Sequence, residues 1–205
     1  MQILIGTTNP SKVEYFHSVL GDIPATLLTL HELGVSGGPQ ETGATPEENA
    51  RIKAAYYGRF ADYVICADSG LYFDALSMDD PRQPGLHVRT VDGARLDDEQ
   101  MIAHYAALSH ALGGKALAYY LNGIALKTPR GIYGIQLTRE EALEGAFYLL
   151  DTPCDARRAG WPLDSLSIDL DGRSFMDPTR RDPRRRGYIE RLRAFVREKL
   201  AETPD

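Results

Sequence analysis

A short loop near the start of the chain has the residue types of an anion-binding site. Residues 6–12 read Gly-Thr-Thr-Asn-Pro-Ser-Lys and lie between an expected strand and an expected helix. Free backbone N–H groups, the helix dipole and the Lys12 ammonium would converge there, which suits a phosphate. The loop is not a Walker A motif, because Ser11 and Val13 flank Lys12 where that motif needs Gly and Ser or Thr. An ordinary capped helix with a surface lysine is the alternative.

Two carboxylates, Glu41 and Asp68, could bind a divalent cation. Glu41 lies in a glycine-flanked turn, and Asp68 follows an apolar run that predicts a buried strand. Ligands collect at strand ends in open α/β sheets. Mg²⁺ prefers such hard oxygen ligands together with phosphate oxygens and water. Alternatively, Asp68 only caps a turn through Ser69 and Gly70.

Two basic features add to this pattern. Asn49 and Lys53 share a helix face by their i,i+4 spacing, although a solvated polar stripe would look the same. Five arginines at positions 180, 181, 184, 185 and 186 lead into the last expected helix. Guanidinium groups in such number favour recognition of a polyanion or of carboxylates, and a solubilising helix start is the alternative. Anion binding together with a divalent metal indicates phosphate chemistry on a nucleotide-sized ligand.

The elements that must position these residues alternate between strand and helix in the first half. Apolar runs predict strands over residues 2–6, 25–30, 63–67 and 71–76, with a turn or bulge at Asp68–Gly70 between the last two. Helices are predicted after Asn9-Pro10, after a capping box at Thr45–Glu48, and over residues 97–112 and 185–200. Residues 77–96 read as a surface loop, and antiparallel strands are expected over 118–126 and 131–137. This order favours an α/β protein with a mixed sheet and flanking helices over a doubly wound parallel sheet.

Composition narrows the class of protein. The 205 residues are 43% hydrophobic and 25% charged, which predicts one globular domain spanning residues 1–205. No stretch approaches the roughly 20 apolar residues of a membrane helix, and the start lacks the pattern of a secretory signal, so we expect a cytoplasmic protein without membrane partners. The net charge of −6 argues against nucleic-acid binding. Two distant cysteines and histidines without an HExxH pattern disfavour a disulfide framework and zinc.

Taken together, these segments resemble the inosine/xanthosine triphosphate pyrophosphatase family of house-cleaning nucleotide hydrolases. The family's T-x-N-x-x-K loop is matched by Thr7, Asn9 and Lys12, and its E-T-G-x-T-x-x-E-N-A-x-x-K-A motif is matched from Glu41 to Ala54. Its D-S-G-L sequence is matched by Asp68–Leu71, and its later P-G and arginine by Pro84, Gly85 and Arg89. The order and spacing of these blocks over residues 1–90 are specific.

The second half matches less closely. The family's F-G-Y-D base-recognition turn corresponds to Trp161-Pro162-Leu163-Asp164, which has lost the Gly and the Tyr. The C-terminal lysine and S-H-R motif correspond to Arg180, Arg185 and Arg186. A further departure is Ala67, which stands where the family usually has an acidic residue before the catalytic Asp.

The resemblance implies an ITPase-like fold of two lobes around a central cleft, and a homodimer. It implies hydrolysis of non-standard purine triphosphates (ITP, dITP, XTP) to the monophosphate and pyrophosphate, with Asp68 catalytic and Mg²⁺ held by Glu41 and Asp68. The substrate-binding residues that it implies are Thr7, Thr8, Asn9, Lys12, Asn49, Lys53, Ser69, Arg89, Trp161, Asp164, Arg180, Arg185 and Arg186. The alternatives are a Maf-like pyrophosphatase acting on pyrimidine or modified nucleotides, and a degenerate nucleotide-binding protein without turnover.

Overall fold

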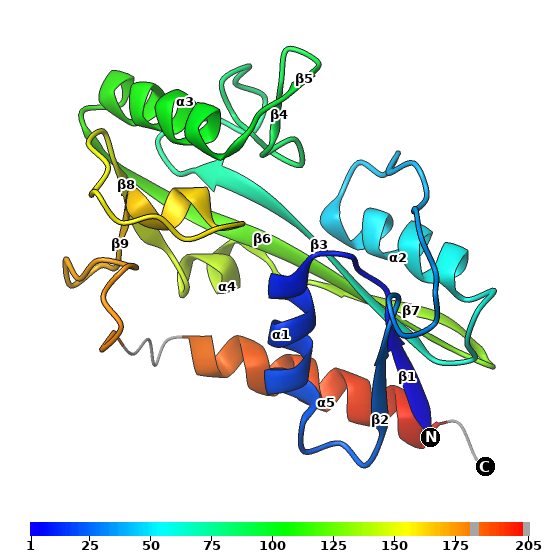
Figure 1. Ribbon diagram of the computed structural model, residues 1–205. Helices are drawn as coiled ribbons and strands as arrows, with labels where there is room; N and C mark the ends of the chain where they lie inside the picture. Colours follow the sequence, from blue (N-terminus) through cyan, green and yellow to red (C-terminus); the bar gives the residue numbers. More distant parts are fainter. Residues whose placement is uncertain (181–184, 203–205) are drawn as a thin grey trace. The chain divides into compact units, whose positions relative to one another are not determined.

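The computed structural model describes residues 1–180 and 185–202, with only the backbone described at Ser11 and at residues 185–188. Its contacts divide the chain into two compact units. Unit 1 consists of Met1–Ser69, Asn122–Thr138 and Arg185–Asp205, and unit 2 of Gly70–Leu121 and Arg139–Arg184. Two long strands, β3 (Val64–Phe73) and β6 (Lys115–Thr128), contribute residues to both units (Figure 1).

The strands form a mixed sheet. Strand β1 (Gln2–Ile5) pairs in parallel with β2 (Thr26–Thr29) and with the start of β3, with Leu4 opposite Val64. Strand β6 pairs antiparallel with β7 (Gly131–Gln136) and with β8 (Phe147–Leu150), which pairs in turn with β9 (Ser167–Ile168). The hydrogen-bonded order is β2-β1-β3-β6-β8-β9, with β7 also on β6. The predicted α/β class with a mixed sheet and flanking helices is confirmed, whereas the arrangement of lobes around a cleft stays a prediction.

In unit 1, helices cover both faces of the sheet because its strands are apolar on both sides (Figure 1). Successive side chains of a strand point to opposite faces. Ile3 and Ile5 of β1 therefore join the core that contains Phe16 of α1 (Pro10–Leu20) and Leu192 of α5 (Arg185–Ala201). Leu4 joins the other core with residues of α2 (Pro46–Tyr57).

Helix α2 begins as predicted and lies unusually close to the sheet. Thr45 caps it by accepting a hydrogen bond from the Glu48 N–H at 3.1 Å, and Pro46 occupies its first turn. A Cβ atom at Gly123 of β6 would come within 2.2 Å of the backbone nitrogen of Glu47, and one at Gly134 of β7 within 2.2 Å of the Glu47 carboxylate. Gly123 thus allows the backbone at the start of α2 to rest directly on the sheet, and Gly134 makes room for the Glu47 side chain.

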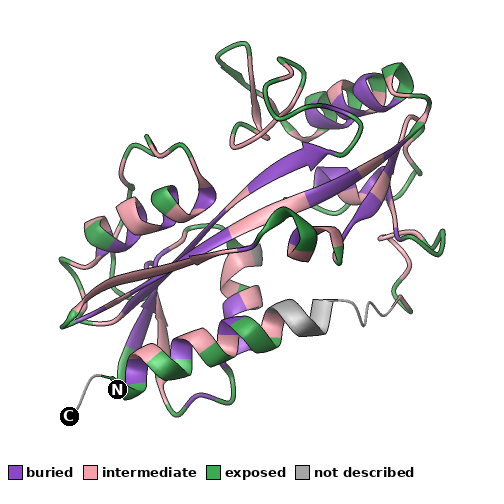
Figure 2. Cartoon of the chain, turned by 180° about the vertical axis from the view of Figure 1, so that it is seen from behind, coloured by how far each residue is buried: buried purple, intermediate pink, exposed green. Residues whose placement is uncertain are grey.

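Unit 2 has its own core and its own helices. It contains α3 (Asp98–Ala111), α4 (Arg139–Leu143), the 3₁₀ helix η1 (Pro162–Ser165) and a hairpin of β4 (Thr90–Val91) and β5 (Ala94–Arg95). Leu71, Phe73, Tyr105 and Phe147 are fully buried in it, and Figure 2 shows the buried side of α3 and the buried ends of the strands. No helix of the described residues is both long enough and apolar enough to span a lipid bilayer.

Three local predictions were wrong. Residues 77–96 were expected to form a loop, but they contain the antiparallel β4–β5 hairpin. Strand β3 runs unbroken through Asp68, Ser69 and Gly70, where a turn or bulge was expected. The polar residues stay in the strand because their side chains find partners there, and Gly70 lets the backbone of Gly85 approach, with Leu71 and Gly85 exchanging hydrogen bonds. The capping box of α2 is also not reciprocal, because the Glu48 carboxylate accepts from the Ala44 N–H at 2.7 Å instead of from Thr45.

Candidate functional site

Asp68 lies in the middle of β3 and is held by two residues of α2. Its Oδ1 atom accepts a hydrogen bond from Lys53 Nζ at 2.9 Å, and its Oδ2 atom accepts one from Asn49 Nδ2 at 3.1 Å. All three residues are at most 9% exposed. The i,i+4 spacing of Asn49 and Lys53 therefore places both donors on the helix face that meets the strand. The solvated-stripe alternative for these two residues is wrong.

A second carboxylate and a second ammonium complete the group. Lys53 Nζ also donates to Glu41 Oε2 at 3.0 Å, so one ammonium bridges Glu41 and Asp68. Lys12 Nζ lies 3.7 Å from Asp68 Oδ1 and donates to the carbonyl oxygen of Ala67 at 3.2 Å. Burial, and next the nearby Lys53 ammonium, lower the pKa of Lys12 below its ordinary value. The lysine of the opening loop thus points toward the catalytic candidate instead of into solvent.

Asn49 connects Asp68 to the irregular segment that carries Glu41. Its Oδ1 atom accepts from the Gly43 N–H at 2.8 Å while its Nδ2 group donates to Asp68. A Cβ atom at Gly43 would lie within 2.7 Å of Asn49 Oδ1, so the close approach of this segment requires glycine. The two hydrogen bonds fix the orientation of the amide, because its oxygen faces a donor and its nitrogen faces a carboxylate.

The opening loop enters α1 with its polar groups accessible. Thr7 is half-buried, Thr8 and Asn9 are exposed, and the Asn9 N–H donates to Thr7 Oγ1 at 3.2 Å. Behind the loop, a Cβ atom at Gly6 would meet Cys66 Sγ at 2.4 Å. Cys66 is fully buried, and burial raises the pKa of its thiol to about 12, so this cysteine is a packing residue.

Ser69 is adjacent to Asp68 but has a different partner. Its Oγ atom donates to Asn122 Oδ1 of β6 at 2.7 Å. No local sequence pattern indicates Asn122, because the contact joins residues 53 positions apart. The carbonyl of Ala67 was missed for a similar reason, since a backbone acceptor has no side-chain signature.

In unit 2, three of the predicted substrate-binding residues line one pocket. Arg89, Trp161 and Asp164 form its wall together with Val88, Met101, Tyr120, Gly160, Pro162 and Leu163. Pro162 and Leu163 are buried and begin the 3₁₀ helix η1, and Trp161 before them remains 40% exposed. The structure therefore brings together three of the four predicted residues of this unit, and the fourth, Arg180, does not line this pocket.

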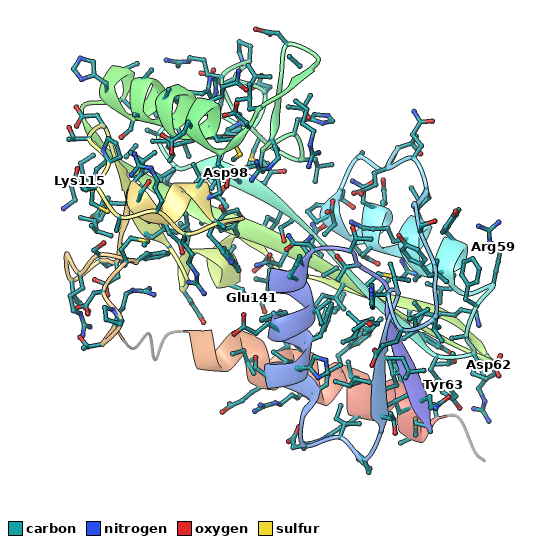
Figure 3. All side chains as sticks on the ribbon, viewed as in Figure 1. Arg59, Asp62, Tyr63, Asp98, Lys115 and Glu141 are labelled. Carbon is teal, nitrogen blue, oxygen red and sulfur yellow. The ribbon has the colours of Figure 1, made fainter. Side chains whose placement is uncertain are left out.

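Two residues that the sequence did not indicate hold this pocket. Asp98, labelled in Figure 3 at the start of α3, accepts from Arg89 Nη1 at 2.7 Å and from the Gly160 N–H at 3.3 Å. The hydrogen bond from Arg89 is the main reason why the pKa of Asp98 lies below its ordinary value. Arg158 lies over the Trp161 ring at 5.3 Å from its centroid and pairs with Asp164 at 3.3 Å.

The arginine-rich segment is only partly described. Arg180 Nε lies 3.3 Å from Oδ2 of the fully buried Asp169, and its guanidinium stacks over Phe175 at 3.8 Å from the ring centroid. Its guanidinium is thus engaged within unit 2. Arg185 and Arg186 belong to the first turn of α5, and their side chains lie outside the described residues.

The donor set around Asp68 is suited to a hard cation only in part. Within the described ranges, no group of three or more His, Cys, Asp or Glu side chains could hold a metal ion. Glu41 and Asp68 nevertheless supply carboxylate oxygens, and Mg²⁺ commonly uses one or two carboxylates with substrate phosphates as its other ligands. The chemistry of the two carboxylates therefore fits Mg²⁺ that is shared with a triphosphate.

Comparison with known proteins agrees with this geometry. The chain is 31% identical over 206 residues to a dITP/XTP pyrophosphatase of Protochlamydia amoebophila, covering 96% of this chain and 98% of that protein. It is 26% identical over 210 residues to a dITP/XTP pyrophosphatase of Thermoanaerobacter sp., covering 98% and 100%. Among solved structures, the Ham1 protein of Staphylococcus aureus has a TM-score of 0.68 at 22% identity, over 97% of this chain and 100% of that one.

The family assignment follows from the extent of these matches. The sequence model of the Ham1 family matches residues 3–150, which include the Asp68 group, Arg89 and the whole of α2 and α3. The resemblance inferred from the motifs of residues 1–90 is confirmed, and it extends to the rest of the chain through the relatives that cover nearly all of it. This protein is therefore a member of the Ham1 family.

Proposed function

We propose that this protein is a nucleoside triphosphate pyrophosphatase that hydrolyses ITP, dITP and XTP to the monophosphate and pyrophosphate. The observation that carries the proposal is Asp68, buried in a strand and held by Lys53 and Asn49 with Lys12 beside it. A carboxylate surrounded by ammonium groups is suited to phosphate chemistry, since the cations bind the anionic substrate while the carboxylate acts on water. The names of the relatives support the same activity and the same substrate class.

Phosphate binding is assigned to the opening loop and the two lysines. The N–H groups of Thr7, Thr8 and Asn9 and the N-terminus of α1 would donate hydrogen bonds to phosphate oxygens, those of Thr7 and Asn9 in exchange for their present bonds to Ile5 O and Thr7 Oγ1. Lys12 and Lys53 would stabilise negative charge on the phosphate oxygens, which is present in the ground state and grows as the bridging oxygen leaves. Ser69, next to Asp68, is a further candidate donor to a phosphate oxygen.

Asp68 is assigned the catalytic role. Its carboxylate would orient or deprotonate the attacking water, and its place on a strand holds it with little freedom. Asn49 keeps the carboxylate in position through the 3.1 Å hydrogen bond. Glu41 and Asp68 would hold Mg²⁺, which supplies neutralisation of the phosphate charge when it is bound.

Base recognition is assigned to the pocket of unit 2. Trp161 offers a ring surface for stacking, with Arg89 and Asp164 as polar groups of the same pocket. Arg180, Arg185 and Arg186 are candidates by resemblance, the last two as donors to the oxo groups of the base. For the assembly we propose one domain over residues 1–205, a homodimer, a cytoplasmic location, and no nucleic-acid or membrane partner.

The test is a panel of nucleoside triphosphates assayed with Mg²⁺ for pyrophosphate release. We expect ITP, dITP and XTP to be the preferred substrates, and Asp68→Asn to be the inactive control. A preference for pyrimidine or modified nucleotides would favour the Maf-like alternative. Nucleotide binding without pyrophosphate release from any substrate would favour the degenerate binding protein, which the substitution of Ala67 for an acidic residue motivates.

A further inference from the structure

The charges around Asp68 balance without a metal ion. The group contains two carboxylates, Glu41 and Asp68, and two ammonium groups, Lys12 and Lys53. Lys53 is 9% exposed and bridges both carboxylates at 3.0 and 2.9 Å. Both oxygens of Asp68 already accept a hydrogen bond, one from Lys53 and one from Asn49. The ammonium of Lys53 thus occupies the electrostatic position between the two carboxylates.

A divalent cation would meet repulsion in this arrangement. To bridge Glu41 Oε2 and Asp68 Oδ1 it must displace Lys53, whose ammonium would lose both carboxylate partners at a buried position. The Lys12 ammonium lies 3.7 Å from the same oxygen, Asp68 Oδ1, and adds a second positive charge. Residue 67 provides no further negative charge to offset this repulsion, because it is an alanine. Its carbonyl oxygen already accepts a hydrogen bond from Lys12.

A triphosphate changes this balance because it brings several negative charges of its own. Its phosphate oxygens can accept the hydrogen bonds of Lys53 and Lys12, which frees the carboxylates of Glu41 and Asp68. The phosphate oxygens and the freed carboxylates can then bind the cation together. We propose that Lys53 is a built-in countercation that keeps the free protein from taking up Mg²⁺, so that the metal enters only together with the triphosphate. This inference rests on the proposed function and concerns the order in which its two ligands bind.

The proposal is tested by titrating the purified full chain with Mn²⁺ in the absence of nucleotide, with free Mn²⁺ measured by electron paramagnetic resonance. We expect weak binding to the wild type and a gain in Lys53→Met, whose affinity should be about tenfold or more higher because a positive charge between the ligands is removed. The added Asp68→Asn substitution should abolish this gain. Lys115→Met, at an exposed lysine of unit 2 labelled in Figure 3, is the matched control and should leave binding unchanged.

Circular dichroism checks that the variants are folded, and Lys53→Gln replaces Lys53→Met if the latter is not. A second arm uses calorimetry with inorganic tripolyphosphate, which should bind the wild type about tenfold more tightly with Mg²⁺ than without it. Tight Mn²⁺ binding to the free wild type, or no gain in either Lys53 variant, would overturn the proposal. Failure of tripolyphosphate to bind at all would instead count against the proposed phosphate site, so the two failures are distinguishable.

Discussion

Arg180→Met should lower the stability of the protein far more than it changes catalysis. The family resemblance assigns Arg180 to the substrate, but its guanidinium stacks on Phe175 and pairs with Asp169, which has no exposed surface. Asp169 Oδ1 also accepts the N–H groups of Asp171 and Arg173 at 3.0 and 2.9 Å. Removing the arginine would leave a buried carboxylate that has lost one of its two guanidinium partners, the less exposed one.

The size of the effect follows from burial. Breaking a fully buried ion pair from one side costs about 3–5 kcal/mol, and losing a guanidinium–ring contact costs about 1 kcal/mol. Because the Arg180 side chain is 13% exposed and Asp169 keeps two N–H donors and the Arg173 guanidinium at 3.5 Å, the lower part of that range applies. We expect a loss of about 3 kcal/mol in the free energy of unfolding.

The dependence on pH gives a second measure. Burial alone would raise the pKa of Asp169, but the N–H groups of Arg173 and Asp171 and the guanidinium groups of Arg173 and Arg180 lower it below its ordinary 3.8. A carboxyl whose pKa is lowered by folding stabilises the protein above its unfolded pKa and loses that contribution as the pH falls through its folded pKa. The difference in the free energy of unfolding between wild type and Arg180→Met should therefore have its full size at neutral pH and decrease below about pH 4.

Urea unfolding followed by circular dichroism provides the assay, with Arg173→Met as the matched control. The Arg173 side chain is 48% exposed, so its pairing with Asp169 should contribute less than about 1 kcal/mol. The reasoning is refuted if Arg180→Met is no less stable than Arg173→Met while its KM for ITP rises. Arg180 would then be a substrate ligand, as the resemblance implied.

Three further predictions concern turnover. Asp68→Asn should lower kcat for pyrophosphate release by about 10²–10⁴-fold, as expected for loss of a general base, with nucleotide affinity largely retained; near wild-type turnover would remove Asp68 from this role. Lys12→Ala should raise KM and lower kcat for triphosphates, and unchanged kinetics would make Lys12 a bystander. Selectivity for ITP and XTP over ATP, measured as kcat/KM, should be narrower than in a Ham1 enzyme with an intact F-G-Y-D turn. Pro162 has no N–H to donate and Leu163 replaces a ring, which leaves Trp161 to stack. Equal or sharper discrimination in a side-by-side assay would contradict this reasoning.

The sequence predicts the elements of unit 1 well because its signals are local. Pro10 and Pro46 mark helix starts, and the i,i+4 pair of Asn49 and Lys53 was correctly placed on one helix face. Asp68 was correctly expected beside a buried apolar run, but the prediction ended the strand at residue 67, whereas β3 continues to Phe73. A carboxylate within a buried strand needs partners such as Lys53, and these are distant in sequence. The turn chemistry suggested by Ser69 and Gly70 was therefore misleading.

Unit 2 was less predictable because its site depends on contacts between separate segments. Asp98 binds both Arg89 and Gly160, which lies 62 positions further along the chain, and no local pattern indicates such a link. Arg158 has no motif of its own, and its role is visible only from its position over Trp161. Arg180 is the opposite case. Its residue type suggested a substrate-binding role, whereas the structure shows it in an ion pair with the buried Asp169.

The two glycines beneath α2 limit which substitutions this enzyme can accept. Gly123 and Gly134 are not proposed ligands, yet Gly123 lets the backbone of the helix that carries Asn49 and Lys53 rest on the sheet, and Gly134 leaves room for the side chains of Glu47 and Arg51. A methyl group at Gly123 would press on backbone atoms, which cannot rotate away as a side chain can, so the whole helix would have to lift. Lys53 and Asn49 would then move away from Asp68 together. Variation that preserves every reactive group can thus still disable the site, and engineering of its specificity should leave this helix–sheet contact untouched.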